Sequence, residues 1–153
     1  MMIRTLASTA IFGLIASSAS AQSPVALQEQ PATVLKAPQK FQPYELPAGT
    51  VFDLVIEHPN ELLPVAMVSS NVYDYYGNVS VPRGSRLIGR FSGAKNGRQF
   101  VEWTELQLSN LGGTLRIDPP LIGTMRDGTA GYDKVVAGAA VMAVNQRGFI
   151  IPH

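Results

Sequence analysis

Cysteine is absent from this chain of 153 residues, and histidine and net charge are scarce. Without cysteine there is no disulfide framework, no thiolate metal site and no lipid attached to a lipobox cysteine. The two histidines are His58, in a polar turn before a proline, and His153, and we interpret neither as a metal ligand. The 12 basic and 11 acidic residues give a formal net charge of +1, which lacks the positive footprint of a nucleic-acid-binding protein.

Recognisable catalytic motifs are also missing from the sequence. Ser85 is not framed by the Gly-x-Ser-x-Gly elbow of a hydrolase. The triplet Asp127-Gly128-Thr129 differs in order from the Asp-Thr-Gly of aspartic proteases. Together with Asp118 and Asp133, it does not form a calcium-loop pattern. We interpret these aspartates as turn residues, and we expect no enzyme activity, no metal site and no cofactor.

The first 21 residues have the features of a cleaved secretory signal peptide. Arg4 supplies a positive region, residues 6–16 form a short apolar region, and Ala19-Ser20-Ala21 is a small-residue cleavage site. The apolar region is shorter than the ~20 residues that span a bilayer. Cleavage before Gln22 removes one basic residue and leaves 11 basic and 11 acidic residues, so the exported protein is formally neutral.

Residues 22–45 are predicted to form a proline-rich linker. Pro24, Pro31, Pro38 and Pro43 are spaced through this segment. Prolines at this frequency block a regular helix and favour extended stretches of polyproline type. The linker is either a spacer or an arm that docks on a neighbouring subunit.

From residue 46 the pattern changes to short β-prone runs separated by glycine, asparagine and proline. Runs rich in valine, isoleucine, phenylalanine, threonine or leucine predict strands over residues 50–57, 65–72, 85–92, 99–108 and 113–118. The pair Asn96-Gly97 between two of these runs is a strong hairpin signal. These features predict an all-β domain over residues 46–153, built as a small β-barrel or sandwich.

Two similar turns lead into two of the predicted strands. Leu46-Pro47-Ala48-Gly49-Thr50 and Val81-Pro82-Arg83-Gly84-Ser85 share the order apolar, proline, any residue, glycine, hydroxyl. In each segment the proline fixes φ and the glycine suits a turn position that disfavours a side chain. The structural turn residues are therefore predicted to be Pro47, Gly49, Pro82 and Gly84. Two copies are too few for a solenoid, and we interpret them as duplicated turns of a pseudo-symmetric barrel.

Residues 135–144 are apolar on every side and include four alanines. They predict a short C-terminal apolar helix of roughly 15 Å, about half the hydrocarbon thickness of a bilayer. Such a helix is either buried or in contact with lipid. One alternative is that another subunit or the outer-membrane interface covers it, and the other is that it caps its own barrel. Under the first alternative the contact residues are Val135, Val136, Ala139, Val141 and Met142.

The aromatic residues allow two interpretations. Tyr73, Tyr75 and Tyr76 lie beside Gly77 and could stack against a ligand, but tyrosines around a hairpin more often pack across the strands or cap a barrel end. Trp103, the one tryptophan, is predicted to lie in the core.

Three stretches of the sequence carry a resemblance to a known family. They are Val68-Ser69-Ser70-Asn71-Val72-Tyr73-Asp74, Val81-Pro82-Arg83-Gly84-Ser85-Arg86-Leu87-Ile88-Gly89 and Val101-Glu102-Trp103-Thr104-Glu105-Leu106. In this order they resemble the C-terminal β-domain of the TrbI-like proteins, the large subunits of the outer-membrane core complex in type IV secretion and conjugation machines. The resemblance covers roughly residues 46–133. It implies a β-domain that assembles into a ring and projects a helical antenna through the outer membrane.

The chain departs from the family pattern in three places. A cleavable signal peptide replaces the inner-membrane anchor, and the antenna region is reduced to residues 135–144. The closing strand after the antenna is expected to be missing, because Phe149-Ile150-Ile151-Pro152-His153 ends where that strand would begin. The barrel is therefore expected to be incomplete or to be completed by a partner strand.

The resemblance and the export signal together predict a structural subunit in the periplasm, associated with the outer membrane, of a type IV secretion or conjugation core complex. Its expected partners are copies of itself, other core-complex subunits and the outer-membrane interface, without direct contact to nucleic acid. The alternative is a stand-alone periplasmic binding or adaptor domain that keeps the fold outside such a machine.

Overall fold

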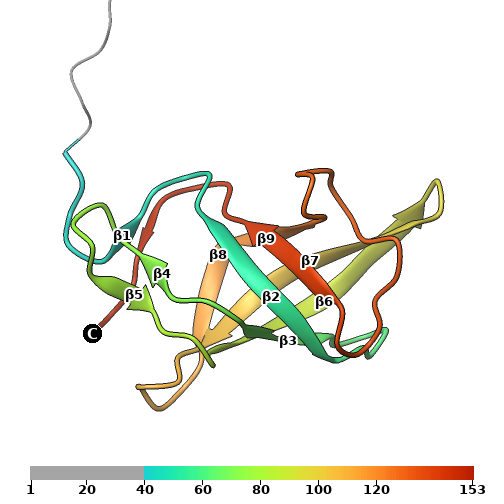
Figure 1. The fold of residues 1–153 in the computed structure, drawn as a ribbon, viewed down its shortest axis with the longest axis horizontal. Helices are drawn as coiled ribbons and strands as arrows, with labels where there is room; N and C mark the ends of the chain where they lie inside the picture. Colours follow the sequence, from blue (N-terminus) through green and yellow to red (C-terminus); the bar gives the residue numbers. More distant parts are fainter. Residues whose placement is uncertain (1–39) are drawn as a thin grey trace, which may run out of the picture. The chain divides into compact units, whose positions relative to one another are not determined.

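The computed structural model describes residues 40–153, which form an all-β domain (Figure 1). The predicted signal peptide, residues 1–21, and most of the predicted linker lie outside the described residues. The strands are β1 (Glu45–Leu46), β2 (Val51–His58), β3 (Val65–Val68), β4 (Val72–Tyr73), β5 (Val79–Val81), β6 (Arg86–Lys95), β7 (Arg98–Gln107), β8 (Leu115–Thr124), β9 (Ala140–Val144) and β10 (Phe149–Ile150). Among these residues there is no helix capable of crossing a membrane.

Six of the strands close into a barrel in the order β2-β3-β6-β7-β8-β9, with every neighbouring pair antiparallel. Two small two-stranded sheets, β1-β10 and β4-β5, accompany the barrel. Figure 1 shows both small sheets at one end of the domain and the tip of the β6–β7 hairpin at the other. The all-β prediction is therefore confirmed, and the architecture is a barrel.

The predicted C-terminal helix is wrong, because β9 occupies the second half of residues 135–144. β9 pairs with β8 on one side and with β2 on the other, so it closes the barrel. The expectation of an incomplete barrel is wrong for the same reason. Val141 and Ala143 point into the core, whereas their neighbours in β9 are less buried, which is the period of two of a strand.

Both segments with the proline–glycine order are turns in the structure. In residues 47–50 and in residues 82–85, the N–H of the last residue donates to the carbonyl of the proline, with an N···O distance of 3.2 Å in each. Gly49 has φ of +86° and Gly84 has φ of +84°. This left-handed conformation is accessible to glycine without the penalty that a Cβ brings.

The two turns also dock on neighbouring strands in the same way. Gly49 N–H donates to the carbonyl of Asn145 and Gly84 N–H to the carbonyl of Val68, each at 2.9 Å. The residue after each glycine accepts the N–H of that same Asn145 or Val68, at 3.1 and 2.7 Å. The duplicated sequence pattern therefore corresponds to a duplicated arrangement of hydrogen bonds in the barrel.

A polar pair of aromatic side chains fills the barrel interior. Trp103 on β7 is fully buried, as is Tyr132 from the β8–β9 loop. The indole Nε1–H of Trp103 donates to the Tyr132 hydroxyl at 3.0 Å, and that hydroxyl donates to the carbonyl of Met142 on β9 at 2.8 Å. Burial raises the pKa of Tyr132, and the hydrogen bond from Trp103 offsets only part of this rise, so the phenol stays protonated and remains a donor.

Two glycines on the barrel wall make room for these rings. A Cβ at Gly89 would lie 2.8 Å from the ring of Trp103, and a Cβ at Gly123 would lie 2.6 Å from the ring of Tyr132. Both contacts are too short for real carbon atoms. The interior is therefore packed with large rings against bare backbone, which is how a small barrel fills its core with side chains.

Candidate functional site

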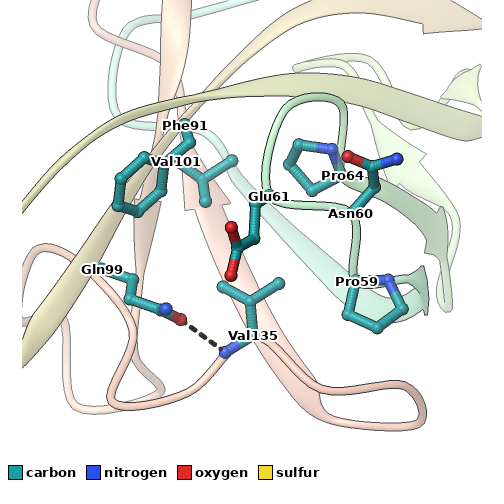
Figure 2. A pocket seen from close by; sticks show the side chains of 8 residues that line it. All are labelled: Pro59, Asn60, Glu61, Pro64, Phe91, Gln99, Val101 and Val135. Atoms are coloured by element: carbon teal, nitrogen blue, oxygen red, sulfur yellow. Dashed lines mark hydrogen bonds between the residues drawn. The ribbon is translucent and has the colours of Figure 1, made fainter.

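A cavity of about 250 Å³ opens where the β2–β3 loop, the β6–β7 ribbon and the β8–β9 loop meet (Figure 2). We call it the docking groove. Its lining residues are Pro59, Asn60, Glu61, Pro64, Phe91, Gln99, Val101 and Val135. They come from three segments that are far apart in the sequence.

The β2–β3 loop is held in place by its own side chains and by the barrel. The Asn60 side-chain oxygen accepts the N–H groups of Leu62 at 2.8 Å and Leu63 at 3.3 Å, which is a local turn typical of asparagine. The carbonyl of Pro64 accepts the N–H of Gly89 on β6 at 2.9 Å. One wall of the groove is therefore tied to the barrel.

The opposite wall is tied to β7. The Gln99 side-chain oxygen accepts the N–H of Val135 at 2.9 Å, and Figure 2 shows this bond across one side of the groove. The backbones of Gln99 and Tyr132 exchange two hydrogen bonds of 2.7 Å. The loop that carries Val135 is thus fixed at two points close together in the sequence.

The groove combines apolar walls with one carboxylate. Phe91 and Val101 form one wall, and Figure 2 shows the Glu61 side chain between that wall and Val135. Within residues 40–153, the ion pairs of Arg86 with Glu57 and of Arg90 with Glu102 are present, but Glu61 has no cationic partner. A carboxylate beside apolar walls suits a ligand that is itself partly apolar and carries a positive charge.

Large apolar side chains are exposed on the same two loops. Leu62 and Leu63 of the β2–β3 loop are 79% and 59% exposed, and Val136, next to Val135, is 49% exposed. Single exposed apolar residues are ordinary, but several on the two loops that supply groove residues are typical of an interaction surface. This arrangement can bind a chain or a ligand.

A second exposed surface lies on the β4–β5 hairpin. Tyr75 is 72% exposed, its ring centre lies 5.3 Å from that of Phe41, and it makes an edge contact with Tyr76 at 5.5 Å. The Tyr76 hydroxyl donates to the carbonyl of Phe41 at 2.7 Å. Tyr75 and Tyr76 therefore hold Phe41 against the domain. Tyr73, on β4, is also exposed.

Asp74 is the main hydrogen-bond acceptor of this second surface. Its carboxylate accepts the backbone N–H groups of Tyr44, Tyr76 and Asn78 and the side-chain amide of Asn78, at 2.7 to 2.8 Å. Partial burial alone would raise the pKa of Asp74, but these hydrogen bonds together outweigh it and hold the pKa below its ordinary value. Asp74 therefore joins the hairpin to the segment that leads into β1.

No protein-family model matches this chain, and no curated protein matches it significantly. The TrbI-like resemblance accordingly stays a prediction.

The five residues predicted as a contact surface do not share one face of the domain. Val141 is buried in the core on β9, and Met142 is half-buried on the same strand. Ala139 and Val135 pack against the core, and Val135 also lines the docking groove, while Val136 is exposed. Of the five, only Val135 lines the docking groove, and Val136 is its exposed neighbour in the chain.

The sequence did not single out most residues of the groove. Phe91 and Gln99 lie within predicted strands and Glu61 lies between two of them, and no motif distinguishes these residues in the sequence. One signal was present, because the pair Leu62-Leu63 lies between two prolines in a segment too polar and too short for a strand. Adjacent large apolar residues in such a loop indicate exposure, and exposure indicates contact with something else.

Of the three aspartates interpreted as turn residues, Asp127 lies in a turn, whereas Asp118 lies within β8, so the turn interpretation is wrong for Asp118. No group of three or more His, Cys, Asp or Glu side chains that could hold a metal ion occurs in the part of the chain that the structure describes. Asp127 accepts the hydroxyl of Thr129 at 2.6 Å and its N–H at 2.9 Å, and these bonds lower the pKa of Asp127. This is the geometry of a local turn.

Proposed function

We propose that the chain is a structural subunit, exported to the periplasm and assembled at the outer membrane into the core complex of a type IV secretion or conjugation machine. The role is scaffolding rather than catalysis, and it uses no cofactor. Sequence support comes from the TrbI-like resemblance over residues 46–133 and from the signal-peptide pattern of residues 1–21.

The docking groove and the exposed apolar residues next to it in the sequence carry this proposal. Leu62, Leu63 and Val136 are exposed on the two loops that supply groove residues, and a subunit must bury such apolar side chains to gain the free energy of desolvation. The closed barrel is a rigid support, because each of its six strands pairs with a strand on both sides over at least part of its length.

The second exposed surface allows a subunit to contact neighbours on two sides. The β4–β5 hairpin lies at one end of the domain, and the tip of the β6–β7 hairpin lies toward the other (Figure 1). Phe91, Gln99 and Val101 of the β6–β7 ribbon line the groove. Two unlike surfaces on one small domain suit contacts that continue from subunit to subunit, as in a ring. The partners we propose are copies of the chain, other core-complex subunits and the outer-membrane interface, and not nucleic acid.

The runner-up is a stand-alone periplasmic binding or adaptor domain. One observation favours it: β9 closes the barrel, so the domain needs no partner strand to complete its fold. Under this alternative the docking groove binds a peptide or small ligand while the protein remains a monomer.

Cross-linking in the native host tests the proposal. A tagged chain is expected to appear in the membrane fraction, in a high-mass complex that contains other secretion subunits. A Leu62→Asp, Leu63→Asp double variant should no longer be found in that complex. Its melting temperature should stay close to that of the wild type. Leu111→Asp is the matched control, because Leu111 is 41% exposed on a different loop. A native protein that is strictly monomeric and cross-links to no secretion subunit would refute the proposal and favour the adaptor.

A further inference from the structure

One edge of β6 has no neighbouring strand in the part of the chain that the structure describes. β3 pairs with β6 only as far as Ile88, and the next residue, Gly89, donates its N–H to Pro64 in the β2–β3 loop. From Arg90 to Lys95, β6 pairs with β7 alone. Backbone groups that alternate along this side of β6 are therefore open to another chain.

This open edge borders the docking groove. Phe91 belongs to the edge and also lines the groove, and Val101, its partner across the ladder, lines it as well. Exposed strand edges are templates for the addition of an extended peptide. The main chain of the peptide then supplies affinity, while a pocket beside the edge selects a side chain.

The β6–β7 ladder is irregular between Phe91 and Gly93, where β6 carries an extra residue. Such a bulge bends the strand and interrupts a straight edge. The available edge is therefore short, which favours a brief peptide segment over the continuous pairing of two sheets. The bulge also disfavours continuous pairing of two copies of the chain along this open edge of β6.

The groove defines which side chains would fit. In an added strand, residues two apart point to the same side. An apolar side chain entering between Phe91, Val101 and Val135 therefore places the residue two positions away on the groove side as well. Glu61, which has no cationic partner among residues 40–153, makes lysine or arginine the complementary choice at that position.

We propose that the β6 edge and the docking groove bind an extended segment of a partner polypeptide by strand addition. The segment has an apolar residue, any residue, and then lysine or arginine. The apolar side chain fills the cavity and the cation pairs with Glu61. This inference rests on the proposed role of the groove in protein interaction, and it specifies which side chains the partner segment carries.

The test uses the chain without its predicted signal peptide and three fluorescent heptapeptides, with binding measured by anisotropy at low salt. The first is Ser-Thr-Ile-Thr-Lys-Thr-Ser, the second has Glu in place of Lys, and the third is the first with alternate backbone nitrogens methylated. The Lys peptide should bind about three- to fivefold more tightly than the Glu peptide, as expected for an exposed ion pair. Backbone methylation should weaken binding about tenfold or more, because it removes strand hydrogen bonds.

Protein variants assign the charge preference to the groove. Glu61→Lys should reverse the preference, so that the Glu peptide becomes the tighter ligand. Glu105→Lys is the control, because Glu105 lies on β7 but does not line the groove, and it should keep the wild-type preference. Thermal melts of both variants check that the barrel remains folded.

Several results would overturn the inference. Equal binding of the methylated peptide would exclude strand addition, and an unchanged preference in Glu61→Lys would exclude the ion pair. No binding of any peptide at millimolar concentration would exclude the site altogether. A chain that self-associates and is released as a monomer by the Lys peptide would assign the groove to a second copy and not to a different partner. If peptide binding fails while the protein still enters the native complex, the inference is wrong and the proposed function stands.

Discussion

Replacing Tyr132 with phenylalanine tests whether the polar aromatic pair holds the barrel interior together. The substitution keeps the ring and removes only the hydroxyl, so it leaves little new cavity. The buried Nε1–H of Trp103 loses its acceptor, and the carbonyl of Met142 loses a donor. A buried donor without a partner costs about 1–3 kcal/mol, and a carbonyl that can accept from elsewhere costs less. We expect a loss of about 2 kcal/mol in the free energy of unfolding.

Urea denaturation followed by tryptophan fluorescence measures this loss directly, because Trp103 is the one tryptophan of the chain and is fully buried. At about 4 °C per kcal/mol for a domain of this size, the melting temperature should fall by about 8 °C. Tyr75→Phe is the matched control: its ring is exposed, and the change should stay within about 0.5 kcal/mol. A Tyr132→Phe variant as stable as that control would refute the reasoning.

Three further predictions use the same denaturation assay. Gly123→Ala should lower the free energy of unfolding by about 1–3 kcal/mol, since its Cβ would lie 2.6 Å from the Tyr132 ring. Gly112→Ala is the control and should be nearly neutral, because nothing lies within 4 Å of its Cβ. Equal losses in the two variants would contradict the packing argument. Gly84→Val should cost about 1–3 kcal/mol because φ is +84° there, and a neutral melt would argue against the left-handed turn. The pKa of Asp74 is lower in the folded state, so its contribution is present above about pH 4 and is lost as pH falls through the folded pKa. Asp74→Asn should therefore be less stable at neutral pH and lose less on acidification, and identical pH profiles would count against this role.

Features encoded by a few adjacent residues could be predicted from the sequence. Asn96 and Gly97 have φ of 53° and 76°, as the tight turn between β6 and β7 requires, and the dipeptide alone indicated this. The strands β2, β6 and β7 were predicted within a few residues, since their β-branched and aromatic runs are bounded by turn residues. The residues of each of these elements determine its conformation, so the sequence of the element is enough to predict it.

The C-terminal segment shows where local reading fails. A short run that is apolar on all sides fits a buried helix and a fully paired strand equally well. The choice depends on β8 and β2, which lie on either side of β9, and these are contributed by residues far away in the sequence. Val141 and Val144 are β-branched, which favours a strand, but this preference is weak beside the pairing with β2 and β8.

β8 was predicted to end at residue 118, but it continues through two prolines to Thr124. Proline lacks the N–H that a central strand donates, so a strand that continues through two prolines is unusual. The register between β7 and β8 explains the outcome: Glu105 faces Arg116 and Trp103 faces Leu121, so the ladder skips the residues between them on β8. The prolines lie within this skipped stretch, where no ladder hydrogen bond is required of them.

The docking groove could not be predicted because no single segment contains it. Its walls are joined by two hydrogen bonds, from Gly89 to Pro64 and from Val135 to Gln99, which exist only once the barrel has formed. These bonds hold the loops in place before a ligand arrives, so less ordering is needed on binding. Tyr132 anchors the same loop that carries Val135, three residues further on. Loss of its hydroxyl should therefore lower both the stability of the barrel and the affinity of the groove for the peptide. A Tyr132→Phe variant that is destabilised but binds the Lys peptide with unchanged affinity would show that Gln99 alone holds this wall of the groove.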